Sequence, residues 1–188
     1  MFLRKKVQLE MDYIPYGGAG YANFRLLQRT TKKIETELIF SPSVAAIIRN
    51  DQGEILLMLD AISNIWSIPA GAIELGETPA EAVIREVWEE TGLKVSPKHL
   101  LGVFGGKDFR WIYPDGNQVE YVTFVFECEV ESGTLHAIDG ESADFRYFNP
   151  SAMPDLQFPY PKEIFYPKAT ESTFFQKPPL GNQTSEDM

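Results

Sequence analysis

The sequence lacks several features that would each indicate a particular class of protein. It holds a single cysteine, Cys128, among 188 residues, which excludes an internal disulfide framework and fits a reducing compartment. It has no run of eighteen apolar residues, and its start, MFLRKK, is not followed by an apolar segment and cleavage site. We therefore expect neither a membrane helix nor a signal peptide, and a cytoplasmic protein with no membrane partner.

Positive charge is also scarce. Lysine and arginine number 17 against 27 aspartates and glutamates, which gives a formal net charge of −10. A nucleic-acid polymer is an unfavourable partner for such a chain, because that binding draws on clustered basic side chains. A small phosphorylated substrate stays compatible with this charge if a metal ion offsets the local field.

The chain length fits about one domain with extensions, and a hydrophobic content of 44% is enough for a core. We divide it into an N-terminal extension (residues 1–40), a main domain (41–156) and a C-terminal segment (157–188). The extension includes the glycine-rich stretch IPYGGAGYANF. The last residues of the chain, polar and rich in proline and glycine, are expected to be disordered.

Several apolar segments are expected to form strands around one helix. Residues 43–48 and 54–59 flank the turn NDQG and predict a β-hairpin, and their near-continuous apolarity predicts burial on both faces. Further strands are expected at residues 66–69, 100–104, 119–130 and 145–148. Such an arrangement indicates a mixed α/β domain.

The helix signals are dense between residues 78 and 92. Thr78 is a suitable N-cap, Pro79 suits the first helical position, and Glu81 completes a capping box. Gly92 stands where a C-terminal stop is expected. These signals predict a helix over residues 79–91.

Three carboxylates share one face of this helix. At about 100° per residue, Glu86, Glu89 and Glu90 fall within one arc. The opposite arc is apolar and is expected to dock on the sheet; it consists of Val83, Ile84, Val87 and Trp88.

Mutual repulsion makes such an acidic face costly, since like charges at i,i+4 destabilise a helix by about 0.2–0.5 kcal/mol per pair. A solvated acidic surface is one explanation. A bound hard divalent cation is the other explanation. A few carboxylates leave some coordination positions of the ion open, which suits a Mg²⁺ or Mn²⁺ that also binds substrate phosphates.

The loop and helix together resemble the box that defines the Nudix hydrolase family. Gly71 is followed after five residues by Glu77, and after seven more by the run REVWEETGL from Arg85 to Leu93. Every defining position matches. The resemblance implies the Nudix fold over about residues 41–156, an α/β/α sandwich with a mixed β-sheet and a catalytic loop-helix.

The resemblance also implies an activity. Relatives hydrolyse the pyrophosphate bond of a nucleoside diphosphate linked to another moiety, with Mg²⁺ or Mn²⁺ and with water attacking phosphorus. ADP-ribose-like compounds, nucleotide sugars and ordinary or oxidised nucleoside triphosphates all stay open as substrates. A catalytically silent Nudix-fold sensor that binds a nucleotide is the alternative, and the resemblance also allows a homodimer.

Site residues follow from the same resemblance. The expected metal ligands are the Ala70 carbonyl and the side chains of Glu86, Glu89 and Glu90. An acid outside the box is expected to join them, and we favour Glu141 over Glu120.

Three box residues are expected to take part in catalysis. Glu86 and Glu89 are the catalytic carboxylates, and which glutamate is the general base varies within the family. Arg85 is expected to orient Glu77 or Glu86. Glu77 itself is expected to stabilise the loop or to join the outer shell of the metal.

Substrate contacts are expected in the turn-rich stretch after the box. Lys107 and Arg110 are candidates for phosphate binding, and Phe109, Trp111 and Tyr113 for stacking on a base. Of these we name Arg110 as the predicted contact.

Overall fold

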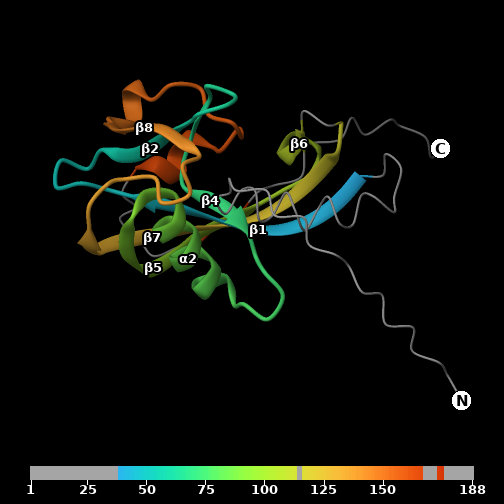
Figure 1. Ribbon diagram of the computed structural model, residues 1–188, viewed down its shortest axis with the longest axis horizontal. Helices are drawn as coiled ribbons and strands as arrows, with labels where there is room; N and C mark the ends of the chain where they lie inside the picture. Colours follow the sequence, from blue (N-terminus) through green and yellow to red (C-terminus); the bar gives the residue numbers. More distant parts are fainter. Residues whose placement is uncertain (1–37, 114–115, 167–172, 176–188) are drawn as a thin grey trace, which may run out of the picture.

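The computed structural model describes residues 38–113, 116–166 and 173–175 (Figure 1). One six-stranded sheet has the order β4-β1-β7-β5-β9, with β6 paired to β7, and a three-stranded sheet has the order β3-β2-β8. The strands are β1 (Leu38–Ile48), β2 (Ile55–Asp60), β3 (Trp66–Ser67), β4 (Ala70–Ala72), β5 (Leu93–Phe104), β6 (Arg110–Ile112), β7 (Gln118–Gly133), β8 (Ser142–Phe148) and β9 (Phe174–Phe175). The helices are α2 (Pro79–Thr91) and the 3-10 turns η1 (Lys107–Phe109), η2 (Pro150–Ala152) and η3 (Lys162–Phe165).

Strand β1 lies between β4 and β7 in the larger sheet. It runs parallel to β7 over its whole length and antiparallel to β4, so the sheet is mixed as expected. Ala45 and Ile47 belong to one core cluster, whereas Val44, Ala46 and Ile48 belong to another. Burial on both faces of this strand, predicted from its apolar sequence, is therefore confirmed.

The two clusters lie on opposite faces of the sheet. Helix α2 covers one of them through Val83 and Val87, where it packs against β5, β1 and β4. The other contains Phe104 together with Ile164 and Phe165 from η3. A layer on each side of the sheet agrees with the expected sandwich, although a 3-10 turn forms the second layer within the described residues.

The predicted β-hairpin is wrong in its pairing. A tight turn does form at the expected place, with Gly53 at φ 75°. However, β1 and β2 belong to different sheets, and within the described residues their ends are joined by an isolated bridge between Arg49 and Ile55. The turn residues specify a chain reversal, but they do not specify which strands pair. Each strand is apolar on both faces and pairs with a longer strand from another part of the chain: β1 with β7, and β2 with β8.

Residues 157–166 pack into the domain. Ile164 and Phe165 are buried, and Arg49 Nη1 donates to the Phe165 carbonyl (2.6 Å). We therefore extend the domain to at least Tyr166. The expected extension up to residue 37 and the expected disorder of the last residues lie outside the described part. Among the described helices, none is long and apolar enough to span a membrane.

Candidate active site

Local signals set both ends of α2. The Thr78 Oγ1 accepts from the Glu81 N–H (3.3 Å), and Glu81 Oε2 accepts from the Thr78 N–H (2.9 Å). Gly92 ends the helix in the left-handed region at φ 71°, and its N–H donates to the Trp88 carbonyl. The predicted bounds, capping box and stop are all confirmed, and α2 holds its acids in a fixed direction.

The helix is turned about its axis from the predicted orientation. Val83 and Val87 are buried as expected, but Ile84 and Trp88 are 40% and 43% exposed. The carboxylate-bearing side turns inward instead, toward β4 and the loop after it. Glu86 and Glu90 are only 1% and 6% exposed, so they need partners that a solvated acidic surface would not need.

Arg85 supplies the loop with its main anchor. Its Nε and Nη2 bind both carboxylate oxygens of Glu77 (2.7 and 2.8 Å), and Nη2 also donates to the Ala72 carbonyl (3.0 Å). The second oxygen of Glu77 accepts from the Glu74 N–H (2.9 Å). The hydrogen bond from Arg85 lowers the pKa of Glu77. Glu77 thus stabilises the loop, which is one of the two roles expected for it.

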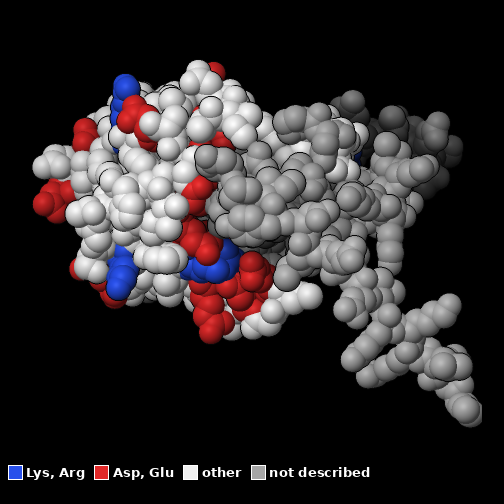
Figure 2. Space-filling view, viewed as in Figure 1, with Lys and Arg blue, Asp and Glu red and all other residues white. Residues whose placement is uncertain are grey.

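The same guanidinium orients two acids of the helix. Arg85 Nη1 donates to Glu86 Oε1 (2.7 Å) and to Glu89 Oε2 (3.1 Å). Its hydrogen bonds to Glu77 and the nearby charge of Glu86 raise the arginine pKa further above its usual range. Figure 2 shows a basic patch between acidic ones over α2 and the preceding loop.

Gly71 makes room for the Glu86 carboxylate. A Cβ at this position would overlap the carboxylate carbon and both carboxylate oxygens of Glu86. The requirement for glycine is therefore a close approach and not a positive φ, which this residue does not have. This contact, together with Arg85, holds the buried carboxylate between α2 and β4.

Glu90 is the second buried carboxylate. Its Oε2 accepts from the Ala70 N–H (2.9 Å), which fixes the side chain against β4. Burial is the largest cause that raises its pKa, and the charges of Glu86, Asp139 and Glu141 raise it further. A concentration of negative charge around one buried carboxylate creates a strong local demand for a cation.

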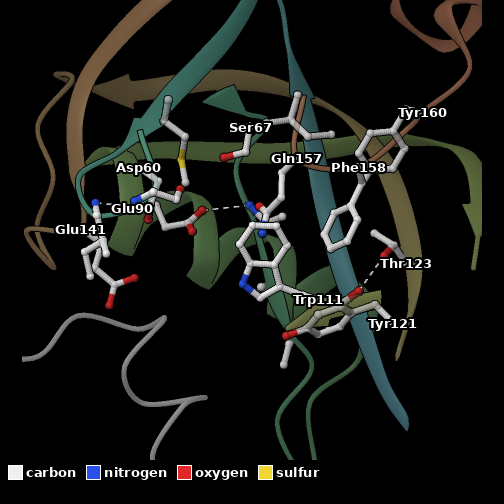
Figure 3. Close-up of a pocket in the computed structure, with 18 of the residues that line it drawn as sticks. Asp60, Ser67, Glu90, Trp111, Tyr121, Thr123, Glu141, Gln157, Phe158 and Tyr160 are labelled. Atoms are coloured by element: carbon white, nitrogen blue, oxygen red, sulfur yellow. Dashed lines mark hydrogen bonds between the residues drawn. The ribbon is translucent and has the colours of Figure 1, made fainter. Parts of the chain in front are cut away.

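A cavity of about 400 Å³ adjoins these carboxylates. Figure 3 shows Glu90 and Glu141 on one side of it and Trp111, Tyr121 and Phe158 on the other. The lining residues come from both sheets, α2 and the C-terminal segment. Their full set is Ser43, Met58, Asp60, Ile62, Ser63, Ser67, Ile68, Ala70, Gly71, Ala72, Glu90, Trp111, Tyr113, Tyr121, Thr123, Glu141, Gln157, Phe158 and Tyr160.

The structure brings most of the predicted metal ligands to one end of this cavity. Ala70, Glu90 and Glu141 line it, and Glu86 lies directly beneath the lining residue Gly71. Glu89 does not line the cavity and is held by Arg85 on the outer side of this cluster. Glu120, the rival of Glu141, is paired with Arg110 (2.6 Å) and also lies outside the lining.

These donors fit a hard divalent cation. They are carboxylate oxygens and one backbone carbonyl, the ligands that Mg²⁺ and Mn²⁺ prefer. Within residues 38–113, 116–166 and 173–175, no three acidic, histidine or cysteine side chains are grouped closely enough to hold an ion by themselves. Mg²⁺ usually keeps several water ligands and shares its remaining positions with substrate phosphates.

The predicted substrate contact Arg110 faces away from the cavity. Successive residues of a strand point to opposite faces, so that in β6 the exposed Arg110 is followed by Trp111, which lines the cavity. Tyr113 also lines it, whereas Phe109 is buried in the core and Lys107 is exposed. The contact expected from Arg110 is better placed on Trp111.

Sequence reasoning missed several lining residues, in two groups. Tyr121 and Thr123 share a face of β7 with the buried Val119 and Val125, and their period of two was a usable signal. The other group consists of Gln157, Phe158 and Tyr160. It reaches the site through the fold of the C-terminal segment, for which the sequence offered only an abundance of aromatics.

Comparisons with known proteins agree with this geometry. A family model described as the NUDIX domain matches residues 40–169. An ADP-ribose pyrophosphatase of Methanocaldococcus jannaschii is 32% identical over 149 residues, which cover 78% of this chain and 84% of that protein. A MutT-like protein of Streptomyces ambofaciens is 34% identical over 115 residues, covering 61% and 68%. The crystal structure of a MutT protein from Methanosarcina mazei Go1 matches with a TM-score of 0.51 at 26% identity, covering 70% of this chain and 94% of that one.

Proposed function

Because the chain belongs to the Nudix hydrolase family and is a Nudix pyrophosphohydrolase, we propose that it hydrolyses a nucleoside diphosphate linked to another moiety. The reaction is attack of water on phosphorus, with Mg²⁺ or Mn²⁺ as the metal. An ADP-ribose-like compound is the first substrate to test. The reason is that the Methanocaldococcus jannaschii relative, 84% of whose length matches this chain, is named an ADP-ribose pyrophosphatase.

One observation carries the proposal. Two buried carboxylates, Glu86 and Glu90, are held in fixed positions at the end of a cavity, and Glu141 lines the same cavity from the loop before β8. A binding module would have no need to hold so much negative charge out of water. A diphosphate brought there by a divalent cation would balance that charge.

Each residue has a defined part in this proposal. The Ala70 carbonyl, Glu86, Glu90 and Glu141 are the groups that would hold the metal, with Glu89 as a further ligand. A bound Mg²⁺ or Mn²⁺ would neutralise the diphosphate oxygens and lower the pKa of the attacking water.

The proton of that water goes to a glutamate of the helix. Glu86 and Glu89 are the candidates, since both receive a hydrogen bond from Arg85 Nη1. Arg85 acts through these carboxylates and is a positioning residue. Its contacts with Glu77 and the Ala72 carbonyl connect the loop to the helix, so that the loop and both acids share one anchor.

The experiment is a mass-spectrometric screen of ADP-ribose, nucleotide sugars and nucleoside triphosphates with Mg²⁺, Mn²⁺ or EDTA. Glu90→Gln should lower kcat about 100-fold or more, the scale expected when one charge-stabilising group is lost. Glu141→Gln should also lower it. Glu120→Gln is the matched control, because this acid is paired outside the cavity, and it should keep the native rate.

Two outcomes would contradict the proposal. Equal losses in Glu141→Gln and Glu120→Gln would mean that the position at the cavity is irrelevant. Saturable nucleotide binding without turnover of any compound, with either metal, would favour the sensor. Comparison of Glu86→Gln with Glu89→Gln then decides between the two candidate bases, since loss of the base should abolish the fall of kcat at acidic pH that protonation of the base causes.

A further inference from the structure

The loop between β7 and β8, residues 134–141, packs against the C-terminal end of α2. The carbonyls in the last turn of a helix have no partner within the helix. Here the Glu89 carbonyl accepts from two N–H groups of this loop, those of Ile138 and Asp139 (3.2 Å each). The loop is therefore fixed to the helix that carries the buried acids.

Asp139 also fixes the backbone of the residue that lines the cavity. Its Oδ1 accepts from the N–H of Glu141, two residues further along the chain (3.0 Å), so the side chain closes a tight turn. Gly140, between them, has φ 75°, which residues with a side chain rarely adopt. The Glu141 carbonyl accepts from the Ala61 N–H (2.9 Å), so the Glu141 backbone is held from both sides.

These contacts connect two acids that are far apart in the sequence. Glu90 lies on α2 and Glu141 lies before β8, and both line the same side of the cavity (Figure 3). Asp139 binds through its N–H to the carbonyl of Glu89, the neighbour of Glu90. It binds through its carboxylate to the Glu141 N–H. One residue therefore connects the helix acid to the loop acid.

The position of Asp139 favours an indirect role. Among the residues that the structure describes, it is not one of those that line the cavity. Its Oδ1 is directed to the Glu141 N–H, and its Oδ2 is buried. A group placed in this way acts on the cavity through the residue that it holds.

We propose that Asp139 is a positioning residue, which holds Glu141 in register with Glu90 so that both carboxylates can bind the same divalent cation. This inference rests on the proposed function for the metal that the two acids would share. It adds a second anchor to the site. Arg85 fixes the acids of the helix and the loop before it, and Asp139 fixes the acid that comes from the other side.

The test is Mn²⁺ binding to the full-length protein without substrate, measured by electron paramagnetic resonance. Asp139→Ala removes the acceptor and should weaken Mn²⁺ binding about 10- to 100-fold, the usual effect of losing a group that orients a metal ligand. Asp139→Asn keeps an oxygen that can accept from the Glu141 N–H and should retain most of the native affinity. Exchange of the Glu141 amide hydrogen should be faster in Asp139→Ala and close to native in Asp139→Asn.

A double variant tests whether Asp139 acts through Glu141. Glu141→Ala removes the side chain that Asp139 positions, so Asp139→Ala should cause no further loss of Mn²⁺ affinity in that background. Asp144→Ala is the matched control. The Asp144 carboxylate also accepts from a backbone N–H, that of Phe145 (2.8 Å), but it lies outside the cavity lining. This variant should bind Mn²⁺ like the native chain.

Gly140 offers a second approach that leaves both acidic side chains in place. A Cβ at this position would meet open space, so Gly140→Ala acts only through strain at its positive φ. It should also weaken Mn²⁺ binding. Gly140→Asn should weaken it less, because asparagine tolerates the left-handed region. Unfolding temperatures show which of the variants are folded.

Native Mn²⁺ affinity in folded Asp139→Ala would overturn the inference. So would an equal loss in Asp139→Asn, which would assign the effect to the charge and not to the hydrogen bond. A further loss in the double variant would also overturn it, because Asp139 would then act by another route than Glu141.

The result is independent of the reaction, because no substrate is present. Mn²⁺ binding that depends on both Asp139 and Glu141, combined with no turnover of any compound, would keep the positioning role and reject the proposed reaction. Native Mn²⁺ affinity in Asp139→Ala, combined with turnover that Glu141→Gln loses, would reject the positioning role and keep the reaction.

Discussion

At the scale of single residues, Gly71 shows how closely the site is packed. An added methyl group would overlap the Glu86 carboxylate, so Gly71→Ala must displace this side chain from the position in which it accepts from Arg85. We expect a loss of about 1–3 kcal/mol in the free energy of unfolding, as for other overpacked buried positions, and at least a tenfold lower kcat. Urea denaturation and steady-state kinetics measure the two effects.

The shorter side chain in Glu86→Asp provides the control. In the double variant the aspartate carboxylate can withdraw from the added methyl, so the two substitutions should destabilise the protein by less than the sum of their separate effects. A coupling free energy of about 0.5–3 kcal/mol is typical for residues in contact. Strictly additive effects would show that Gly71 is needed for another reason.

At the scale of elements, the C-terminal segment depends on Arg49. This arginine, at the end of β1, donates to the Phe165 and Ile164 carbonyls and pairs with Glu127 (3.0 Å). Arg49→Met removes these donors and leaves two partly buried carbonyls without them, so we expect a loss of about 1–3 kcal/mol in unfolding free energy. Hydrogen exchange should show faster exchange in residues 157–165.

Arg110→Met is the matched control for that element. It breaks one ion pair between a partly exposed arginine and Glu120, a contact worth about 0–1 kcal/mol, and touches no part of the segment. If both variants lose the same stability, and exchange in residues 157–165 stays at the native rate in Arg49→Met, the anchoring role is wrong.

Elements also differ in how far the sequence predicts them. The ends of α2 could be predicted because Thr78, Glu81 and Gly92 act within a few residues of the positions that they cap. Its orientation about its axis could not, since Glu86 and Glu90 turn inward through Arg85 and the Ala70 N–H. Those contacts depend on where β4 lies, which no local pattern specifies. The pairing of β1 with β2 was predicted wrongly for the same reason.

The site shows the same division. The spacing from Gly71 to Leu93 predicted its acidic end, because these residues are neighbours in sequence as well as in space. The aromatic end joins β6, β7 and the C-terminal segment, so its members are separated along the chain. Trp111 could be identified as a candidate, but its partner Phe158 could not.

At the scale of the whole molecule, the buried acids should make stability depend on pH and metal. The raised pKa of Glu90 means that the folded protein holds this proton to a higher pH than the unfolded chain. Between the two pKa values the folded state binds more protons, so the free energy of unfolding must fall as pH rises through this window. Glu77 acts in the opposite sense. Its pKa is lowered, so its contribution is present above the unfolded pKa and is lost as the pH falls.

The metal-free protein should therefore be most stable at mildly acidic pH, which unfolding temperatures in EDTA can establish. Glu90→Gln removes the ionisation but keeps an oxygen that can accept from the Ala70 N–H, so its unfolding temperature should fall less as the pH rises from about 5 to 8. Mg²⁺ should raise the unfolding temperature of the native chain chiefly at the upper end of this pH range. A ligand stabilises only the state that binds it, and the Glu90 carboxylate must be ionised to bind the ion. The same pH dependence in the native chain and in Glu90→Gln would contradict this origin of the effect and assign it to other acids.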